Sequence, residues 1–196
     1  GMDYIKWGDM QELIQRVGRA KAFIDNGMCR VGPGMDEAGV GDALLVRGAG
    51  RAIVLADAIV ALCRQDHPEE ALAVLRQLAE TAVSLRWLAA LPEARASSLD
   101  SELQTVRWET LWDEERFLSR ARETGLEAEA KEALAYCIHF VRGGRVTLPW
   151  GHRFGPKQDA ELHVEEVLRR AGSWLNLVLK ALDARWPGFF PGAEQP

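Results

Sequence analysis

The feature that most constrains this chain is a series of long segments in which apolar residues recur every three or four positions. Such spacing is typical of amphipathic α-helices that bury one face. Each segment ends near glycine or proline, which interrupt helices. We predict helices over residues 3–25, 42–65, 68–90, 97–123, 126–141 and 157–185. Only residues 145–148 favour a short extended piece.

The fold class that these segments predict is all-α. Long helices with short connections bury their apolar faces by packing side by side. We therefore expect an antiparallel bundle of four main long helices with one or two additional helices. A chain of 196 residues can bury a sizeable core. We predict one domain over residues 1–196, with an irregular loop at 143–156 and a frayed tail at 191–196.

Composition excludes several kinds of partner and site. The formal net charge of -5 gives no overall attraction to nucleic acid or anionic lipid. The most apolar segment, 43–63, carries Arg47, Arg51 and Asp57, which are too many charges for a membrane span. The three cysteines are widely spaced without a CxxC pair, which predicts no disulfides and a reducing, cytoplasmic setting. Metal-ligand and phosphate-loop motifs are also missing from the sequence, so we predict no metal and no cofactor.

Ionisable residues on two neighbouring helices form the first candidate site. Asp57 is the one polar residue in the apolar run 53–62, and a helix that is apolar on all sides belongs inside a bundle. An unpaired carboxylate there would be costly. On the following helix, Arg76 and Glu80 share a face and lie at a similar distance from the connecting turn. We predict a buried cluster of Asp57, Arg76 and Glu80, which either fixes helix packing or forms a binding site.

The loop at 143–156 and its flanks form the second candidate site. They gather basic and aromatic residues in an otherwise acidic chain: Arg142, Arg145, Trp150, His152, Arg153, Phe154 and Lys157. A phosphate group or an acidic partner suits such a set. His152 titrates near neutral pH, and it can transfer a proton if it lies beside Arg76 or Glu80. The alternative is that Trp150 and Phe154 close the end of the bundle while the cations are solvated.

An apolar helix, a short break at 64–68 and a second helix carrying Arg76 and Glu80 make up residues 52–90. In this arrangement the chain resembles a bacterial helical family of unknown function whose hallmark is an R-x3-E pair on a central helix. By this resemblance Arg76 and Glu80 are the paired residues, and His152 corresponds to a recurrent loop histidine. That family is distantly similar to the HEPN helical superfamily, which includes toxin-like ribonucleases.

HEPN ribonucleases resemble one another in an R-x4-6-H motif, whose arginine holds phosphate and whose histidine helps to activate the 2′-hydroxyl. Arg145 and His152 have the permitted six-residue gap. The segment departs from the motif because Pro149 and Gly151 interrupt the helix that carries it, and because Val146 replaces a polar residue. The resemblance implies that Arg145 would contact phosphate and that His152 would transfer a proton.

Two functions from different classes remain open. The first is a non-catalytic module that binds a partner protein or an anionic ligand through the loop, with Asp57, Arg76 and Glu80 as part of its architecture. The alternative is a HEPN-like ribonuclease or toxin-system component that acts on RNA with Arg145 and His152. Wide apolar helix faces favour self-association, so we also predict a homodimer.

Overall fold

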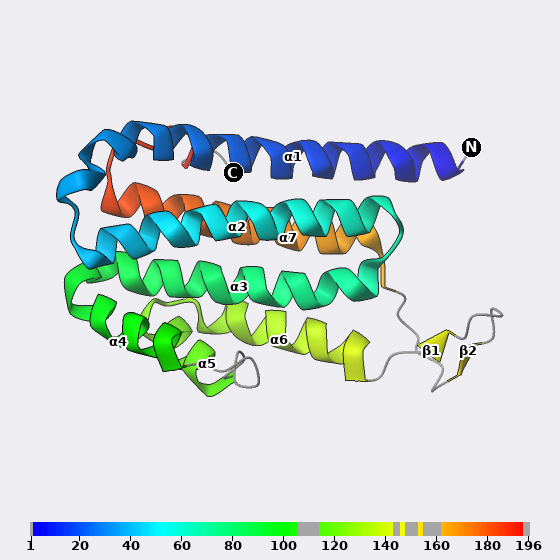
Figure 1. The fold of residues 1–196 in the computed structure, drawn as a ribbon. Helices are drawn as coiled ribbons and strands as arrows, with labels where there is room; N and C mark the ends of the chain where they lie inside the picture. The colour runs from blue at the N-terminus through cyan, green and yellow to red at the C-terminus, as the bar shows by residue number, and fades with distance from the viewer. Residues whose placement is uncertain (1, 106–113, 143–145, 148–152, 155–161, 194–196) are drawn as a thin grey trace.

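The computed structural model of the chain describes residues 2–105, 114–142, 146–147, 153–154 and 162–193 (Figure 1). Within these residues the chain forms seven α-helices, one 3-10 helix and one pair of short strands. The elements are α1 (Met2–Val31), the 3-10 helix η1 (Gly32–Glu37), α2 (Val40–Arg64), α3 (Pro68–Ala90), α4 (Pro92–Thr105), α5 (Glu114–Glu123), α6 (Glu127–Arg142), β1 (Val146–Thr147), β2 (Arg153–Phe154) and α7 (Val164–Arg185). The predicted all-α class is confirmed.

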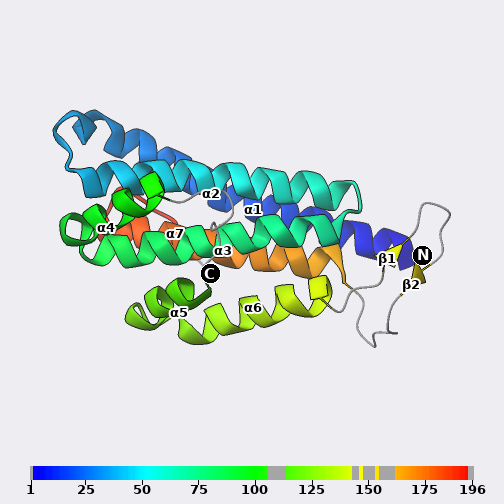
Figure 2. The same ribbon diagram turned by 60° about the horizontal axis from the view of Figure 1, so that its bottom comes forward.

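Four long helices, α1, α2, α3 and α7, pack side by side as a bundle (Figure 1). Helix α7 contacts each of the other three, and the pair of α5 and α6 covers the outer side of α3 (Figure 2). Helix α4 packs against α2 and α3. Helix α2 runs antiparallel to α1 and α3, whereas α7 runs in the same direction as α1 and α3, because α6 first carries the chain back (Figure 1).

Helix α7 supplies much of the core. Its apolar residues recur at helical spacing and are buried against the three surrounding helices: Val167, Leu168, Ala171, Trp174, Leu175, Val178, Leu179, Ala181 and Leu182. Burying one leucine or valine side chain contributes about 1.5–3 kcal/mol. The last long helix of the chain therefore holds the bundle together from its centre.

Helix α1 continues to Val31, so the predicted helix end at residue 25 is wrong. Gly27 lies inside the helix, where a Cβ atom would overlap with the ring of Phe190. Phe190 is only 1% exposed. The glycine at this position allows close approach of the C-terminal segment instead of ending the helix.

The residues after α7 return to α1. Arg30 Nη1 donates a hydrogen bond to the carbonyl oxygen of Phe189 at 3.2 Å, and Gly192 lies against the ring of Phe23. Ala193 is buried. Residues 191–193 therefore lie against the bundle, residues 194–196 lie outside the described part, and the predicted fraying of the tail at 191–196 stays a prediction.

Three other helix boundaries differ from the prediction. Pro92 starts α4 instead of only closing α3, since proline fits the first turn of a helix. The predicted helix 97–123 is described as two pieces, α4 and α5, with residues 106–113 outside the described part. Helix α7 begins at Val164, later than predicted. In the loop, β1 pairs antiparallel with β2 through Val146 opposite Phe154, which confirms a short extended piece there.

A partly buried ion pair joins the start of α2 to the end of α7. Arg185 Nε and Nη2 each donate to a carboxylate oxygen of Asp42 at 2.7 Å, in a bidentate arrangement. Asp42 is 8% exposed. Each charge also suits its helix end, because the first turn of α2 favours an anion and the last turn of α7 favours a cation.

We expect Gly27→Ala to destabilise the protein by about 1–3 kcal/mol, because the Phe190 ring must move to admit the methyl group. Gly18 is the matched control: it lies in the same helix, and no described heavy atom lies within 4 Å of an added Cβ. Gly18→Ala should stabilise by about 0.5–1 kcal/mol. Urea unfolding measures both changes, and equal stability of the two variants would contradict the packing of Phe190 on Gly27.

Replacing Arg185 by glutamine should lower the free energy of unfolding by about 2–3 kcal/mol, because Asp42 would remain as a buried carboxylate without its partner. Arg169→Gln removes an exposed partner of Glu166 and should change stability by less than about 0.5 kcal/mol. The same urea titration compares the two variants. A loss no larger for Arg185→Gln than for Arg169→Gln would show that the Asp42 pair does not join α2 to α7.

Candidate functional site

A row of polar side chains follows one side of α3. Arg76, Glu80 and Ser84 are four residues apart, and all three are partly buried. Helix α5 packs against α3 and brings Arg116 and Arg120, which are also four residues apart. The helical repeat places each set on one face of its helix, so charged groups from two helices meet here.

Glu80 lies between Arg76 and Ser84 in this row on α3. Burial raises the pKa of Glu80 above its ordinary value of 4.5, and nearby positive charges lower the pKa by a smaller amount. In order of effect, these charges are Arg120, Arg76, Arg116 and Arg51. We refer to the four arginines as the arginine cluster. They come from α2, α3 and α5, so three helices position them.

Arg120 is held by its surroundings. It is 8% exposed, its Nη1 donates to Ser84 Oγ at 3.4 Å, and its Cζ lies 4.7 Å from the centre of the Trp87 ring. Trp87 is fixed in turn, because its indole nitrogen donates to Glu123 Oε2 at 2.6 Å and Arg95 Cζ lies 4.6 Å from its ring centre. Cation–π contacts of this kind favour a buried guanidinium.

The other arginines of the cluster are more accessible. Arg76 Nη2 lies 3.7 Å from Glu114 Oε1, and Arg51 Nη2 donates to Gln77 Oε1 at 3.0 Å. Arg51 is exposed. The carboxylates of Glu80 and Glu114 lie among these arginines.

The model of DUF5677, a family of unknown function, matches residues 42–139, which is half of the chain. The chain belongs to DUF5677. The prediction of a family of unknown function is thereby confirmed. No curated protein and no solved structure matches the chain. The DUF5677 match includes Glu80 and the whole arginine cluster, and it ends before Arg142.

The predicted buried cluster of Asp57, Arg76 and Glu80 is wrong in its first member. The Asp57 side chain is 57% exposed and forms an ion pair with Lys21 of α1. Asp57 lies on the outer stripe of α2 with Val54, which is 63% exposed. Because the exposed Val54 is apolar, the sequence of α2 gave the impression of a helix that is apolar on every side. Arg76 and Glu80 do lie near each other, as predicted.

The loop residues that the sequence singled out lie largely outside the described part of the chain. Arg145, Trp150 and His152 lie outside the described residues, as do the side chains of Arg142 and Arg153. Their joint site stays a prediction. The described residues of the segment from 145 to 152 form strand β1, so the R-x6-H spacing does not lie on one continuous helix.

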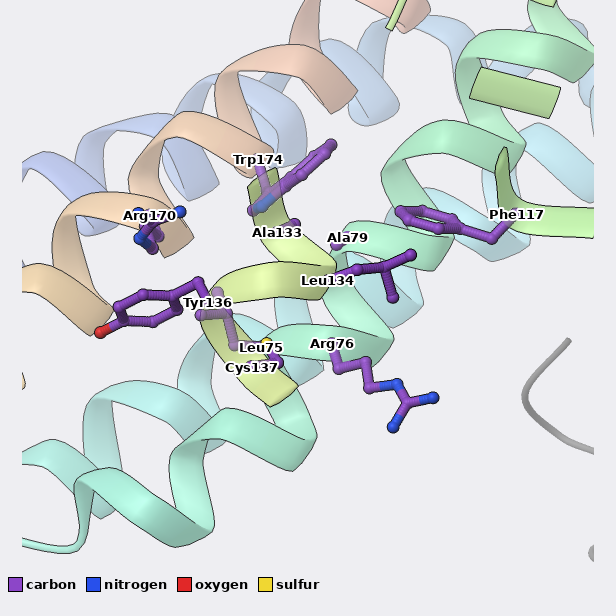
Figure 3. Close-up of a pocket in the computed structure, with 10 residues that line it drawn as sticks. All are labelled: Leu75, Arg76, Ala79, Phe117, Ala133, Leu134, Tyr136, Cys137, Arg170 and Trp174. Carbon is purple, nitrogen blue, oxygen red and sulfur yellow. The ribbon is translucent and has the colours of Figure 1, made fainter. Parts of the chain in front are cut away.

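A small cavity lies between α3, α5, α6 and α7 (Figure 3). Most of its wall is apolar, with Leu75, Leu134 and Trp174 among the lining residues, and it has room for about one water molecule. Figure 3 shows Arg170 beside the Tyr136 ring; its Cζ lies 3.9 Å from the ring centre. A cavity of this size does not hold a small organic ligand.

Two buried cysteines lie in the core. Burial raises the pKa of the Cys63 thiol to about 12 and also raises the pKa of Cys137. Both thiols stay protonated at neutral pH, so neither is suited to act as a nucleophile.

The described residues contain no group of His, Cys, Asp and Glu that could hold a metal ion. Among the same residues, no helix is long and apolar enough to span a membrane.

Sequence analysis did not identify Arg51, Arg116 and Arg120 as site residues. A signal for the last two was present, because Arg116 and Arg120 repeat at four residues beside Phe117 and Ala121, the apolar positions of a highly charged helix. This pattern indicates a helix face that packs with its arginines partly buried. Arg51 carries no comparable signal.

We expect Glu80→Gln to gain stability relative to the wild type as pH rises from about 4 to about 7.5. The folded state raises the pKa of Glu80, so the folded protein holds this proton more tightly than the unfolded chain. The contribution of the Glu80 carboxyl group to the free energy of unfolding is therefore full below pH 4.5, and it is lost as pH rises through the raised pKa of Glu80. Glutamine does not ionise and avoids the decline.

Urea unfolding at several pH values measures this trend. Glu129→Gln changes an exposed carboxylate on α6 and serves as the control, which should show no comparable gain with pH. A Glu80→Gln variant whose relative stability falls toward neutral pH would show that the arginines outweigh the cost of burial.

Proposed function

We propose that this DUF5677 protein is a non-catalytic helical module that binds an anionic ligand at the arginine cluster. The observation that carries the proposal is that arginines from three helices lie along one face of α3, near enough to the partly buried carboxylate of Glu80 to act on it electrostatically, with Arg120 against Ser84 and Arg76 beside Glu114. The formal net charge of the whole chain is -5, so this concentration of positive charge is local. An anion gains most where arginines are already positioned.

The arrangement supports binding because the cluster combines fixed and accessible groups. Arg120 is held between Ser84 and Trp87, so little side-chain entropy remains to be lost when it meets a ligand. Arg76 is partly exposed and Arg51 is exposed, so an anion can reach them from solvent. Arginine keeps its charge throughout the physiological pH range and presents a planar set of donors to oxyanions.

The loop predictions extend this proposal. Arg142, Arg153 and Trp150 would add a second basic surface for an acidic partner, in a cytoplasmic protein that forms a homodimer. The HEPN-like ribonuclease alternative rests on the resemblance and on the spacing of Arg145 and His152 alone. None of the described contacts favours the ribonuclease over a binding module.

Inorganic phosphate is the probe that tests the binding site. We expect isothermal titration calorimetry at constant ionic strength to give a dissociation constant of about 1 mM or lower for the wild type, and a value at least about tenfold higher for Arg76→Met. Arg47→Met removes the same charge from an exposed position on α2 and should stay within about twofold of wild type. Equal weakening by both substitutions, or no saturable binding to the wild type, would contradict the proposal.

A further inference from the structure

Helices α5 and α6 form a layer of their own on the outside of the four-helix bundle (Figure 2). The two helices pack on each other and mainly on α3. We refer to residues 114–142, which contain both helices and the turn between them, as the outer hairpin. Helix α7, by contrast, contacts α1, α2 and α3 and lies inside the bundle.

Few large apolar side chains hold the outer hairpin to the bundle. Among its described side chains, the buried apolar residues larger than cysteine are Phe117, Leu126 and Leu134. Helix α7 alone buries Trp174 together with several leucines and valines. A cavity with room for about one water molecule also lies between the hairpin and the bundle. Since apolar burial is the main stabilising contribution in a fold, the hairpin is held less strongly than α7.

Charged and polar contacts supply much of the remaining attachment, and they involve both helices of the outer hairpin. On α5, Glu123 Oε2 accepts a hydrogen bond from the Trp87 indole nitrogen at 2.6 Å, and Arg95 Nη2 lies 3.5 Å from the same oxygen. On α6, Glu132 Oε1 accepts from Nη2 of Arg170, a residue of α7, at 3.3 Å. These contacts join the hairpin to α3, α4 and α7.

Salt weakens contacts of this kind, because their acidic partners are open to solvent. The side chains of Glu114, Glu123 and Glu132, which pair with arginines of the bundle and of α4, are 43%, 51% and 69% exposed. Charges at such positions are screened over about 10 Å at 0.1 M salt and over shorter distances as the concentration rises. The attachment of the outer hairpin therefore depends on ionic strength more than the apolar packing of α7 does.

We infer that the outer hairpin is a salt-sensitive cover, which separates from α3 and α7 as one unit while the four long helices stay folded. The closed form predominates and keeps Arg120 in position against Trp87. In the open form Leu75, Ala79 and Trp174, which line the cavity beside the hairpin, become accessible to solvent (Figure 3). The inference does not depend on the proposed anion site.

Hydrogen exchange of the wild-type full chain, followed by mass spectrometry of peptides from each helix, is the first test. At about 50 mM sodium chloride, we expect the most protected amides of α5 and α6 to exchange at least about tenfold faster than those of α7, after correction for intrinsic rates. Their exchange should also depend less on urea, because opening of the hairpin exposes less surface than global unfolding. Raising the salt to about 500 mM should speed exchange in both α5 and α6 at least about threefold.

Substitutions on α7 distinguish opening of the hairpin from unfolding of the whole protein. Arg170→Gln removes the ion pair with Glu132 and should speed exchange in both α5 and α6 at least about fivefold. Arg169→Gln, which affects a pair within α7, should leave the hairpin within about twofold of wild type. Arg185→Gln breaks the pair with Asp42, which stays intact when the hairpin separates. It should speed exchange in α7 at least about tenfold and leave the hairpin within about twofold of wild type.

Three results would overturn the inference. Equal acceleration of the hairpin and α7 by Arg185→Gln would show that the hairpin opens only when the whole protein unfolds. Faster exchange in α6 without α5 in Arg170→Gln would show that the two helices do not separate as a unit. Wild-type hairpin exchange that does not change with salt would show that the charged contacts do not hold the cover closed.

Discussion

The burial of α7 between α1, α2 and α3 is the constraint on which the rest of the structure depends. This helix carries apolar side chains toward three neighbours at once, so removing it would expose the inner faces of all of them. The pair of Asp42 and Arg185 fixes one end of α7 to α2. The packing of Phe190 on Gly27 then continues the same contact onto α1.

Because α2 and α7 cover the apolar sides of α3, the remaining side of α3 is left for α5 and α6. That side carries the row of Arg76, Glu80 and Ser84, so the helix pair that covers it must accommodate charge. Helix α5 does so with arginines, and Arg120 is buried with the Trp87 ring and the Ser84 hydroxyl as neighbours. The candidate site therefore lies on a rigid support, which is the condition for positioned charges to recognise an anion.

The sequence predicts the helices well because helical periodicity is a local property. Helix α3 begins and ends at its predicted residues, and the start of α2 differs by two residues. The errors occur where a residue has two uses. Gly27 can end a helix or admit a neighbour, and only the distant Phe190 decides between them. An apolar residue such as Val54 is usually taken to indicate a buried helix face, but Val54 is exposed. Asp57 lies on the same exposed side of α2, where it pairs with Lys21.

The candidate site was predictable only in part for the same reason. The spacing of Arg76 and Glu80 places both on one face of α3, but it does not reveal which helix covers that face. The partners Arg116 and Arg120 come from α5, separated in sequence by α4 and by residues 106–113. The sequence suggested Asp57 as the partner instead, because Asp57 and Arg76 lie at similar distances from the turn that joins α2 to α3. Counting residues from a turn gives the position along each helix, but it does not show which face of the helix points inward.

Glu80 itself gives a reason to look for a role beyond packing. Its ionised form is disfavoured by burial even with four arginines nearby, so a glutamine of similar shape would suit the folded state better at neutral pH. Stability alone therefore does not account for a carboxylate here. Groups whose pKa is shifted by burial and by nearby charges are frequent at binding and catalytic sites, which is a reason to test the surroundings of Glu80 for a ligand.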